Sequence, residues 1–189
     1  MARQRPDHLV IGVDANAELL REILHRATRK PARGGVPNAL FGRLSLEESP
    51  GELARLADSL TVLFPWGSLL RAVAVPQVGA LEKLAALGKP GAGIRFLYGY
   101  GATRESRTVE ALELPELGGP SALRTLERGY AAAGLDVRAR YVSREEVASV
   151  QSSWGKKLAF SGIERVFVEL SLQGKSGTSH EAHGASDSG

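Results

Sequence analysis

Two tryptophans, the only ones in the chain, stand in short segments suited to binding a flat ligand. Trp66 follows an apolar run at 60–64 that predicts a buried strand, and Trp154 is followed closely by Lys156 and Lys157. The carboxyl edge of a sheet, where such a strand ends, is where open α/β folds bind ligands. Indole faces next to lysines favour a nucleic-acid base as the ligand. The alternative is that both rings are ordinary core residues.

Composition narrows the class of protein. The 189 residues, 43% hydrophobic and 24% charged, predict one soluble globular domain. The chain has no cysteine and only four histidines, so we expect neither a disulfide nor a metal site. No apolar run approaches the roughly 20 residues needed to span a bilayer, and the amino terminus lacks a signal-peptide core. We therefore expect a cytoplasmic protein with no membrane partner.

Strand and helix patterns alternate along the chain and predict an α/β fold with a doubly wound, mostly parallel sheet. The expected strands cover 8–13, 39–44, 60–64, 93–100, 137–142 and 165–172. The expected helices cover 17–29, 51–57, 69–73, 78–87, 121–133 and 144–158. Residues 1–173 form the predicted domain. Residues 174–189 are rich in Gly, Ser, His and Ala and have little to bury, so we expect a disordered tail.

Two acidic residues are candidates for binding a nucleoside. Asp14 closes the first strand, where a carboxylate can accept hydrogen bonds from both hydroxyls of a ribose. Alternatively, Asp14 is the N-cap of the following helix. Glu47 follows the strand at 39–44, where a polar loop could border an adenine ring. The alternative for Glu47 is a solvated carboxylate in the first turn of a helix.

A cluster of cations could grip phosphates. Arg26, Arg29, Lys30 and Arg33 gather near the end of one helix, next to two glycines. Favourable interaction with the helix dipole would explain two of these charges but hardly all four. The net charge of +3 is modest, so the distribution of charge is more informative than its sum.

Four spaced motifs resemble one known family. Asp14 is the first of the four, and the others are 29–38, 57–59 leading to 63–70, and 152–160. In this order they resemble the aminoglycoside-resistance 16S rRNA adenine-N1 methyltransferases, which modify the decoding-site adenine at position 1408. The resemblance runs from about Leu9 to Leu172. It implies a class I, Rossmann-like methyltransferase fold, S-adenosylmethionine as cofactor, and 16S rRNA in the 30S subunit as partner of a monomeric enzyme.

The resemblance also implies a role for each candidate residue. Asp14 is similar to the acid that holds the ribose of the methyl donor. The rest of the donor site would comprise Ser45, Leu46, Glu47, Phe64 and Pro65. Trp66 and Trp154 resemble the two rings that sandwich the flipped target adenine, and Ser152 resembles a polar residue that helps to place the loop and cofactor. The rRNA-binding residues would be Arg26, Arg29, Lys30, Arg33, Lys156 and Lys157.

One family feature is missing from this sequence. Members of the family begin with a strand and a Gly-x-Gly-x-Gly loop before the segment that corresponds to Leu9–Asp14, where this chain has only Met1–His8. That strand lies mid-sheet in the family, so we expect unpaired edges on the strands ending at Asp14 and Phe64. Either the start codon is assigned too late, or the chain is a truncated, catalytically impaired RNA-binding relative.

Overall fold

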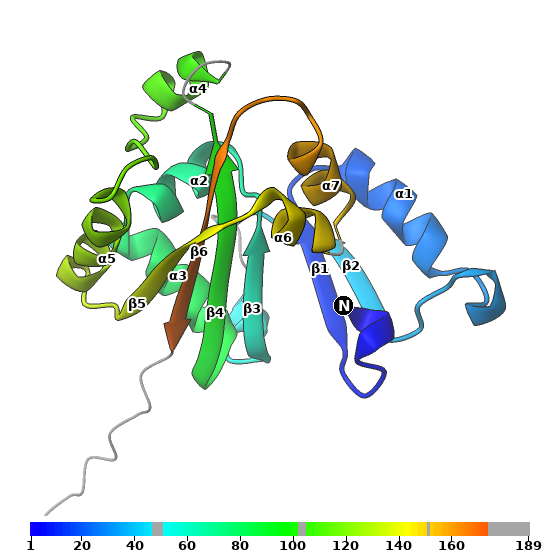
Figure 1. Ribbon diagram of the computed structural model, residues 1–189. Helices are drawn as coiled ribbons and strands as arrows, with labels where there is room; N and C mark the ends of the chain where they lie inside the picture. The colour runs from blue at the N-terminus through cyan, green and yellow to red at the C-terminus, as the bar shows by residue number, and fades with distance from the viewer. Residues whose placement is uncertain (47–50, 102–104, 151, 174–189) are drawn as a thin grey trace, which may run out of the picture. The chain divides into compact units, whose positions relative to one another are not determined.

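The computed structural model describes residues 1–46, 51–101, 105–150 and 152–173. These residues divide into two units (Figure 1). Unit 1 combines Met1–Leu53 with Ser143–Ile163, and unit 2 combines Ala54–Val142 with the chain from Glu164 onward. Each unit is described by itself.

Unit 1 is built on a pair of parallel strands. Strand β1 (Val10–Asp14) pairs with β2 (Ala39–Arg43), and helix α1 (Ala17–Ala27) connects the two. Short 3₁₀ turns cover Ala2–Gln4, Pro31–Arg33 and Gly51–Leu53. Helices α6 (Arg144–Ser149) and α7 (Ser153–Ala159) contact each other in the same unit.

Unit 2 contains a four-stranded sheet in the order β3-β4-β6-β5. Its strands are β3 (Ala57–Leu63), β4 (Gly88–Tyr100), β5 (Val137–Val142) and β6 (Val166–Gln173). Its helices are α2 (Gly67–Ala74), α3 (Val78–Leu87), α4 (Ser106–Ala111) and α5 (Ala122–Ala132). Strand β3 is parallel to β4, whereas β6 is antiparallel to both β4 and β5. The α/β class is thus confirmed, with a mixed sheet.

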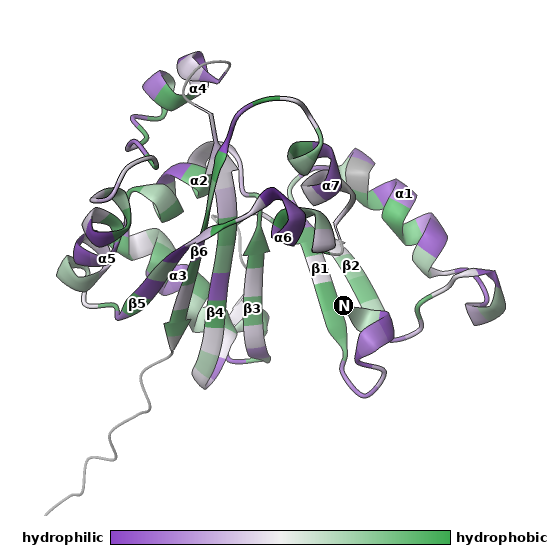
Figure 2. Ribbon diagram, in the orientation of Figure 1, coloured by the Kyte–Doolittle hydropathy of each residue, from purple (hydrophilic) through white to green (hydrophobic). Residues whose placement is uncertain are grey.

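The expectation of two open strand edges is confirmed. Among the described residues, β1 pairs only with β2, and β3 has only β4 as a neighbour. Three apolar side chains on and just before β1 are at least half exposed, Leu9 at 61%, Ile11 at 50% and Val13 at 52%, and Figure 2 shows β1 as largely hydrophobic. The strand expected at 8–13 is thus present as β1, and these three apolar side chains on or beside it are exposed.

The core of unit 2 lies between the sheet and the helices α2 and α5. The rings of Phe96 on β4 and Tyr130 on α5 lie 6.5 Å apart, and Tyr130 Oη donates to the carbonyl of Val73 on α2 at 2.9 Å. Burial raises the pKa values of Tyr98, Tyr100 and Tyr130, so their hydroxyls remain neutral. These contacts fix the helices to one face of the sheet.

Two of these tyrosines give opposite expectations for stability. Tyr130→Phe removes a buried, satisfied hydrogen bond and should lower the free energy of unfolding by about 1 kcal/mol. Tyr98 Oη is buried and has no partner among the described residues, so Tyr98→Phe should be neutral or stabilising. Urea denaturation of both variants measures the difference. Equal destabilisation by the two substitutions would contradict this account of the core.

Two expected helices are wrong in detail. The helix expected at 51–57 is only a 3₁₀ turn at Gly51–Leu53, and β3 already begins at Ala57. The chain leaves the helical conformation at Arg55, which has a positive φ of 57° and donates its N–H to the carbonyl of Ala86. Residues 144–158 form two helices instead of one, because Ser152 is extended and caps a new helix. The strand expected at 93–100 begins earlier, at Gly88, and contains Gly91 with a positive φ of 82°.

Candidate functional site

The turn between β3 and α2 presents Trp66 in unit 2. Phe64 has a positive φ of 50°, a conformation that costs a bulky residue about 1–3 kcal/mol, and Gly67 has a φ of 60°. The Phe64 ring is buried edge-on against Phe167 at 6.5 Å, and Pro65 is buried beside it in sequence. Such a strained backbone conformation persists only where the surrounding packing maintains it. Conformations of this kind are common at functional sites. The turn therefore anchors two side chains and leaves the third, Trp66, exposed.

Both tryptophans are exposed, and the interpretation of them as core residues is wrong. Trp66 is 56% exposed at the N-cap position of α2, and Trp154 is 52% exposed in the first turn of α7. A large aromatic side chain that stays half in water on a short, well-anchored element is available to a ligand. Trp66 belongs to unit 2 and Trp154 to unit 1, so the pairing of their rings stays a prediction.

The start of α7 is positioned by a cap. Ser152 accepts a hydrogen bond at its Oγ from the N–H of Gly155 at 3.2 Å. Ser152 is therefore the N-cap of α7, which begins at Ser153, so Trp154 falls in the first turn. Lys156 and Lys157 follow in the last turn, and both are exposed. The helix thus presents an indole and two cations within one short element.

Asp14 lies where β1 ends, and its carboxylate does not cap α1. Its Oδ1 accepts a hydrogen bond from the N–H of Asn16 at 2.7 Å, whereas Asn16 Oδ1 accepts the N–H of Glu18 at 2.9 Å. Asn16 is therefore the helix cap, and the Asp-x-Asn pattern before the helix is the signal that sequence reasoning missed. Among the described residues Asp14 Oδ2 accepts no hydrogen bond, so one carboxylate oxygen is available to a ligand hydroxyl.

The strand ends bring part of the predicted donor site together. Asp14 pairs with Arg43 across β1 and β2, and the N–H of Leu44 donates to the Asp14 carbonyl at 3.1 Å. Ser45 and Leu46 follow directly and are half-buried. Carboxyl ends of adjacent parallel strands form the usual ligand-binding edge of an α/β sheet. Glu47 lies outside the described residues.

The basic segment, residues 26–33, is exposed and held by its neighbours. Arg26 pairs with Glu22 at 3.4 Å within α1, and Arg29 Nη2 lies 3.4 Å from His25 Nδ1. Lys30 and Arg33 are exposed, and neither has an ion pair among the described residues. Most of this segment's charge is therefore available to an external anion.

Two contacts that sequence reasoning missed fix the shape of the basic segment. Asn38 Nδ2 lies within 3.0 Å of the carbonyl oxygens of Ala2, Arg5 and His8, and the Arg3 guanidinium donates to the Gly34 carbonyl. A side chain at Gly35 would meet the Arg29 carbonyl oxygen at 1.6 Å, so glycine is required there. The chain before β1 thus clamps the loop that carries the cations.

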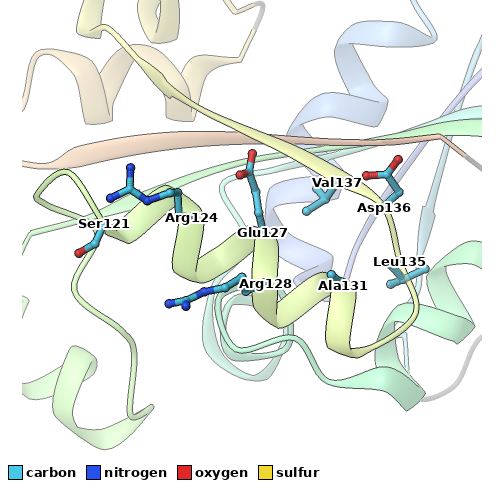
Figure 3. Close-up of a pocket in the computed structure, with 8 residues that line it drawn as sticks. All are labelled: Ser121, Arg124, Glu127, Arg128, Ala131, Leu135, Asp136 and Val137. Atoms are coloured by element: carbon cyan, nitrogen blue, oxygen red, sulfur yellow. The ribbon is translucent and has the colours of Figure 1, made fainter.

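A separate cavity of about 660 Å³ lies between α5 and β5 in unit 2 (Figure 3). Two arginines, Arg124 and Arg128, and two acids, Glu127 and Asp136, are part of its lining, so their formal charges cancel. Glu127 is already engaged, because it accepts the N–H of Ala139 at 2.9 Å. None of the predicted site residues lines this cavity.

The described residues contain no cluster of three or more His, Asp or Glu side chains that could hold a metal ion. Within the same ranges, no helix is both long and apolar enough to cross a membrane.

Comparison with known proteins identifies close relatives. A family described as "NpmA: 16S rRNA (adenine(1408)-N(1))-methyltransferase" matches residues 1–172. The 16S rRNA (adenine(1408)-N(1))-methyltransferase of Streptoalloteichus tenebrarius is 38% identical, over 84% of this chain and 73% of its own length. The enzyme of the same name from Escherichia coli is 34% identical, over 85% of this chain and 74% of its own length.

Solved structures show the same similarity. The 16S rRNA methyltransferase KamB superposes with a TM-score of 0.78 at 35% identity, covering 92% of this chain and 80% of its own. A tryptophan-to-alanine variant of the 16S rRNA (adenine(1408)-N(1))-methyltransferase from Catenulisporales acidiphilia, solved with the cosubstrate SAM, gives a TM-score of 0.73 at 32% identity. That match covers 92% of this chain and 78% of the other.

Proposed function

The chain belongs to the 16S rRNA (adenine(1408)-N(1))-methyltransferase family, and we propose that it methylates N1 of that adenine and thereby confers aminoglycoside resistance. Family membership supports the reaction. The observation that carries the assignment of the base-binding residues is the exposure of both Trp66 and Trp154. The proposed methyltransferase domain comprises residues 1–173.

The chemistry requires little acid-base assistance. The N1 lone pair of neutral adenine is nucleophilic, and S-adenosylmethionine supplies an electrophilic methyl group on a sulfonium. The protein must extrude the base, which costs a few kcal/mol, and align N1 with the methyl carbon. Stacking on Trp66 and Trp154, worth about 1–3 kcal/mol per face, offsets much of that cost. Ser152 supports this arrangement by fixing the start of α7.

The described donor-site residues fit S-adenosylmethionine. Asp14 has an available carboxylate oxygen at a strand end for the ribose hydroxyls, and Ser45 and Leu46 follow the neighbouring strand end. Phe64 and Pro65 would form an apolar wall at the end of β3, and Glu47 completes the proposed adenine pocket. This assignment rests on chemistry and position at the two strand ends.

The proposed macromolecular partner is 16S rRNA within the 30S subunit, bound by a monomer in the cytoplasm. Arg26, Arg29, Lys30 and Arg33 would contact phosphates, and Lys156 and Lys157 would contact the backbone near the flipped adenine. Exposed cations on a clamped loop support this proposal, because phosphate contacts position a protein on RNA.

A second function, RNA binding without catalysis, is favoured by one observation. Among the described residues, strands β1 and β3 are each at the edge of their own sheet, with one edge unpaired. Calorimetric titration of the purified chain with S-adenosylmethionine separates the two functions. We expect saturable binding with one site. Normal RNA binding without any donor binding would instead support the non-catalytic function.

The basic segment should contribute measurably to RNA affinity. Removing two phosphate contacts with Arg29→Ala and Lys30→Ala should reduce the slope of log affinity against log salt by about two. Filter binding of 30S subunits at several salt concentrations measures this slope. The matched control is Lys83→Ala with Arg107→Ala, which removes the same charge from exposed positions in unit 2. Equal effects of the two pairs would show that only total charge matters.

A further inference from the structure

One face of the unit 2 sheet carries a polar row that crosses all four strands. Strand register places Thr61 on β3 opposite Arg95 on β4, Arg95 opposite Ser171 on β6, and Ser171 opposite Arg138 on β5. Directly opposed residues share a face, and adjacent strands are about 4.8 Å apart. Hydroxyl and guanidinium groups therefore alternate along one line. Thr61, Ser171 and Arg138 are exposed, and Arg95 is half-buried.

The carboxylate of Glu169, two residues before Ser171 on the same face of β6, holds two guanidinium groups in place. Glu169 on β6 is only 8% exposed, and its Oε2 accepts hydrogen bonds from both Nε and Nη2 of Arg95. Its Oε1 accepts a hydrogen bond from Arg140 Nε at 3.2 Å. A buried carboxylate paired in this way fixes the orientation of both arginines. Because both arginine side chains are already ordered, binding an anion costs less side-chain entropy.

The helices of unit 2 leave the polar row exposed, whereas Leu97 and Phe167 on the same face are buried. Phe96, the neighbour of Arg95 on the opposite face, contacts Tyr130 of α5, and Tyr130 bonds to α2. Figure 1 shows α2, α3 and α5 together behind the sheet, and Figure 2 shows hydrophilic bands on β4 and β5. The open face carries Arg95, Arg138 and Arg140 against Glu169, three positive charges against one negative, for a net charge of +2.

We propose that this face, defined by Arg95, Arg138, Arg140, Thr61 and Ser171, is a second binding surface for the phosphate backbone of 16S rRNA. The identity of the RNA rests on the proposed function, whereas the phosphate chemistry rests on the surface itself. Guanidinium groups bind phosphate oxygens through paired N–H donors, and neighbouring hydroxyls add further donors. Because the surface contacts backbone and not bases, it adds affinity and no sequence preference.

The test compares two double variants that remove equal charge from opposite faces of unit 2. Arg138→Ala with Arg140→Ala removes two positive charges from the open face and leaves Glu169 paired with Arg95. Arg124→Ala with Arg128→Ala removes two exposed arginines of α5 (Figure 3). Binding of each full-length protein to 30S subunits is measured by filter binding without S-adenosylmethionine. Thermal unfolding of both variants confirms that they are folded.

We expect the open-face variant to lose roughly tenfold or more in affinity and about two units of salt slope. The α5 variant should keep the affinity and slope of the unmodified protein. Equal losses in both variants, or no loss in the open-face variant, would overturn the proposal. Absence of methyl transfer by the unmodified protein, with its 30S binding intact, would instead count against the proposed function alone. A variant that unfolds is replaced by Arg138→Gln, judged by the same salt slope.

Discussion

Trp154→Ala is expected to lower the rate of adenine methylation by about 5- to 150-fold. This range corresponds to the loss of one aromatic stack, worth about 1–3 kcal/mol. The indole is 52% exposed on α7, and it has no role in the core that its removal would disturb. The affinity for S-adenosylmethionine should change little. Single-turnover methylation of 30S subunits and calorimetric titration with the donor measure the two quantities separately.

The same helix offers a matched control for this effect. Phe160, directly after α7, is 78% exposed and has no assigned role, so Phe160→Ala should leave methylation nearly unchanged. Trp154→Phe keeps an aromatic face and should recover much of the rate. Trp66→Ala should behave as Trp154→Ala does. Loss of donor binding in either tryptophan variant would contradict the stacking role.

Asp14→Ala should produce the reverse pattern. Hydrogen bonds to a charged group contribute about 1.5–3 kcal/mol, so donor affinity should fall by roughly 10- to 150-fold. At saturating donor the methylation rate should largely recover, because Asp14 is not assigned to the base. Calorimetry gives the affinity, and rates at increasing donor concentration give the recovery.

A control variant separates the effect of the Asp14 charge from that of its hydrogen bond with Asn16. Its Oδ1 accepts the N–H of Asn16 at 2.7 Å, so Asp14→Ala could also loosen the start of α1. Asp14→Asn keeps an acceptor oxygen for that bond but removes the charge. A similar loss of donor affinity in both variants supports the ribose role. Full donor affinity in Asp14→Asn would show that the carboxylate charge is unimportant.

Local sequence patterns predicted the regular elements well. The helix expected at 78–87 and the strand expected at 137–142 match α3 and β5 in full. The pattern failed where backbone conformation depends on distant partners. The positive φ of Arg55 goes with a hydrogen bond to Ala86, which no local periodicity encodes. Residue types at 144–158 suited one helix, but the cap at Ser152 divides it.

Sequence patterns indicated candidate site residues but did not indicate the environment of those residues. Trp66 is exposed on the strained turn after Phe64, and Asp14 is freed from capping by Asn16. Composition could not distinguish an exposed indole from a buried one, because burial depends on neighbouring elements. The clamp by Asn38 was likewise invisible, since its acceptors are backbone carbonyls about thirty or more residues away in sequence.

The most direct test of the central claim is to map the modified nucleotide in 16S rRNA. Purified protein is incubated with 30S subunits and S-adenosylmethionine, and the rRNA is then reverse transcribed through the decoding site. A methyl group on N1 blocks the Watson–Crick edge, so we expect a donor-dependent stop at adenine 1408 that is strongly reduced with Trp154→Ala. Donor binding with read-through at this adenine, or a stop at another nucleotide, would contradict the account.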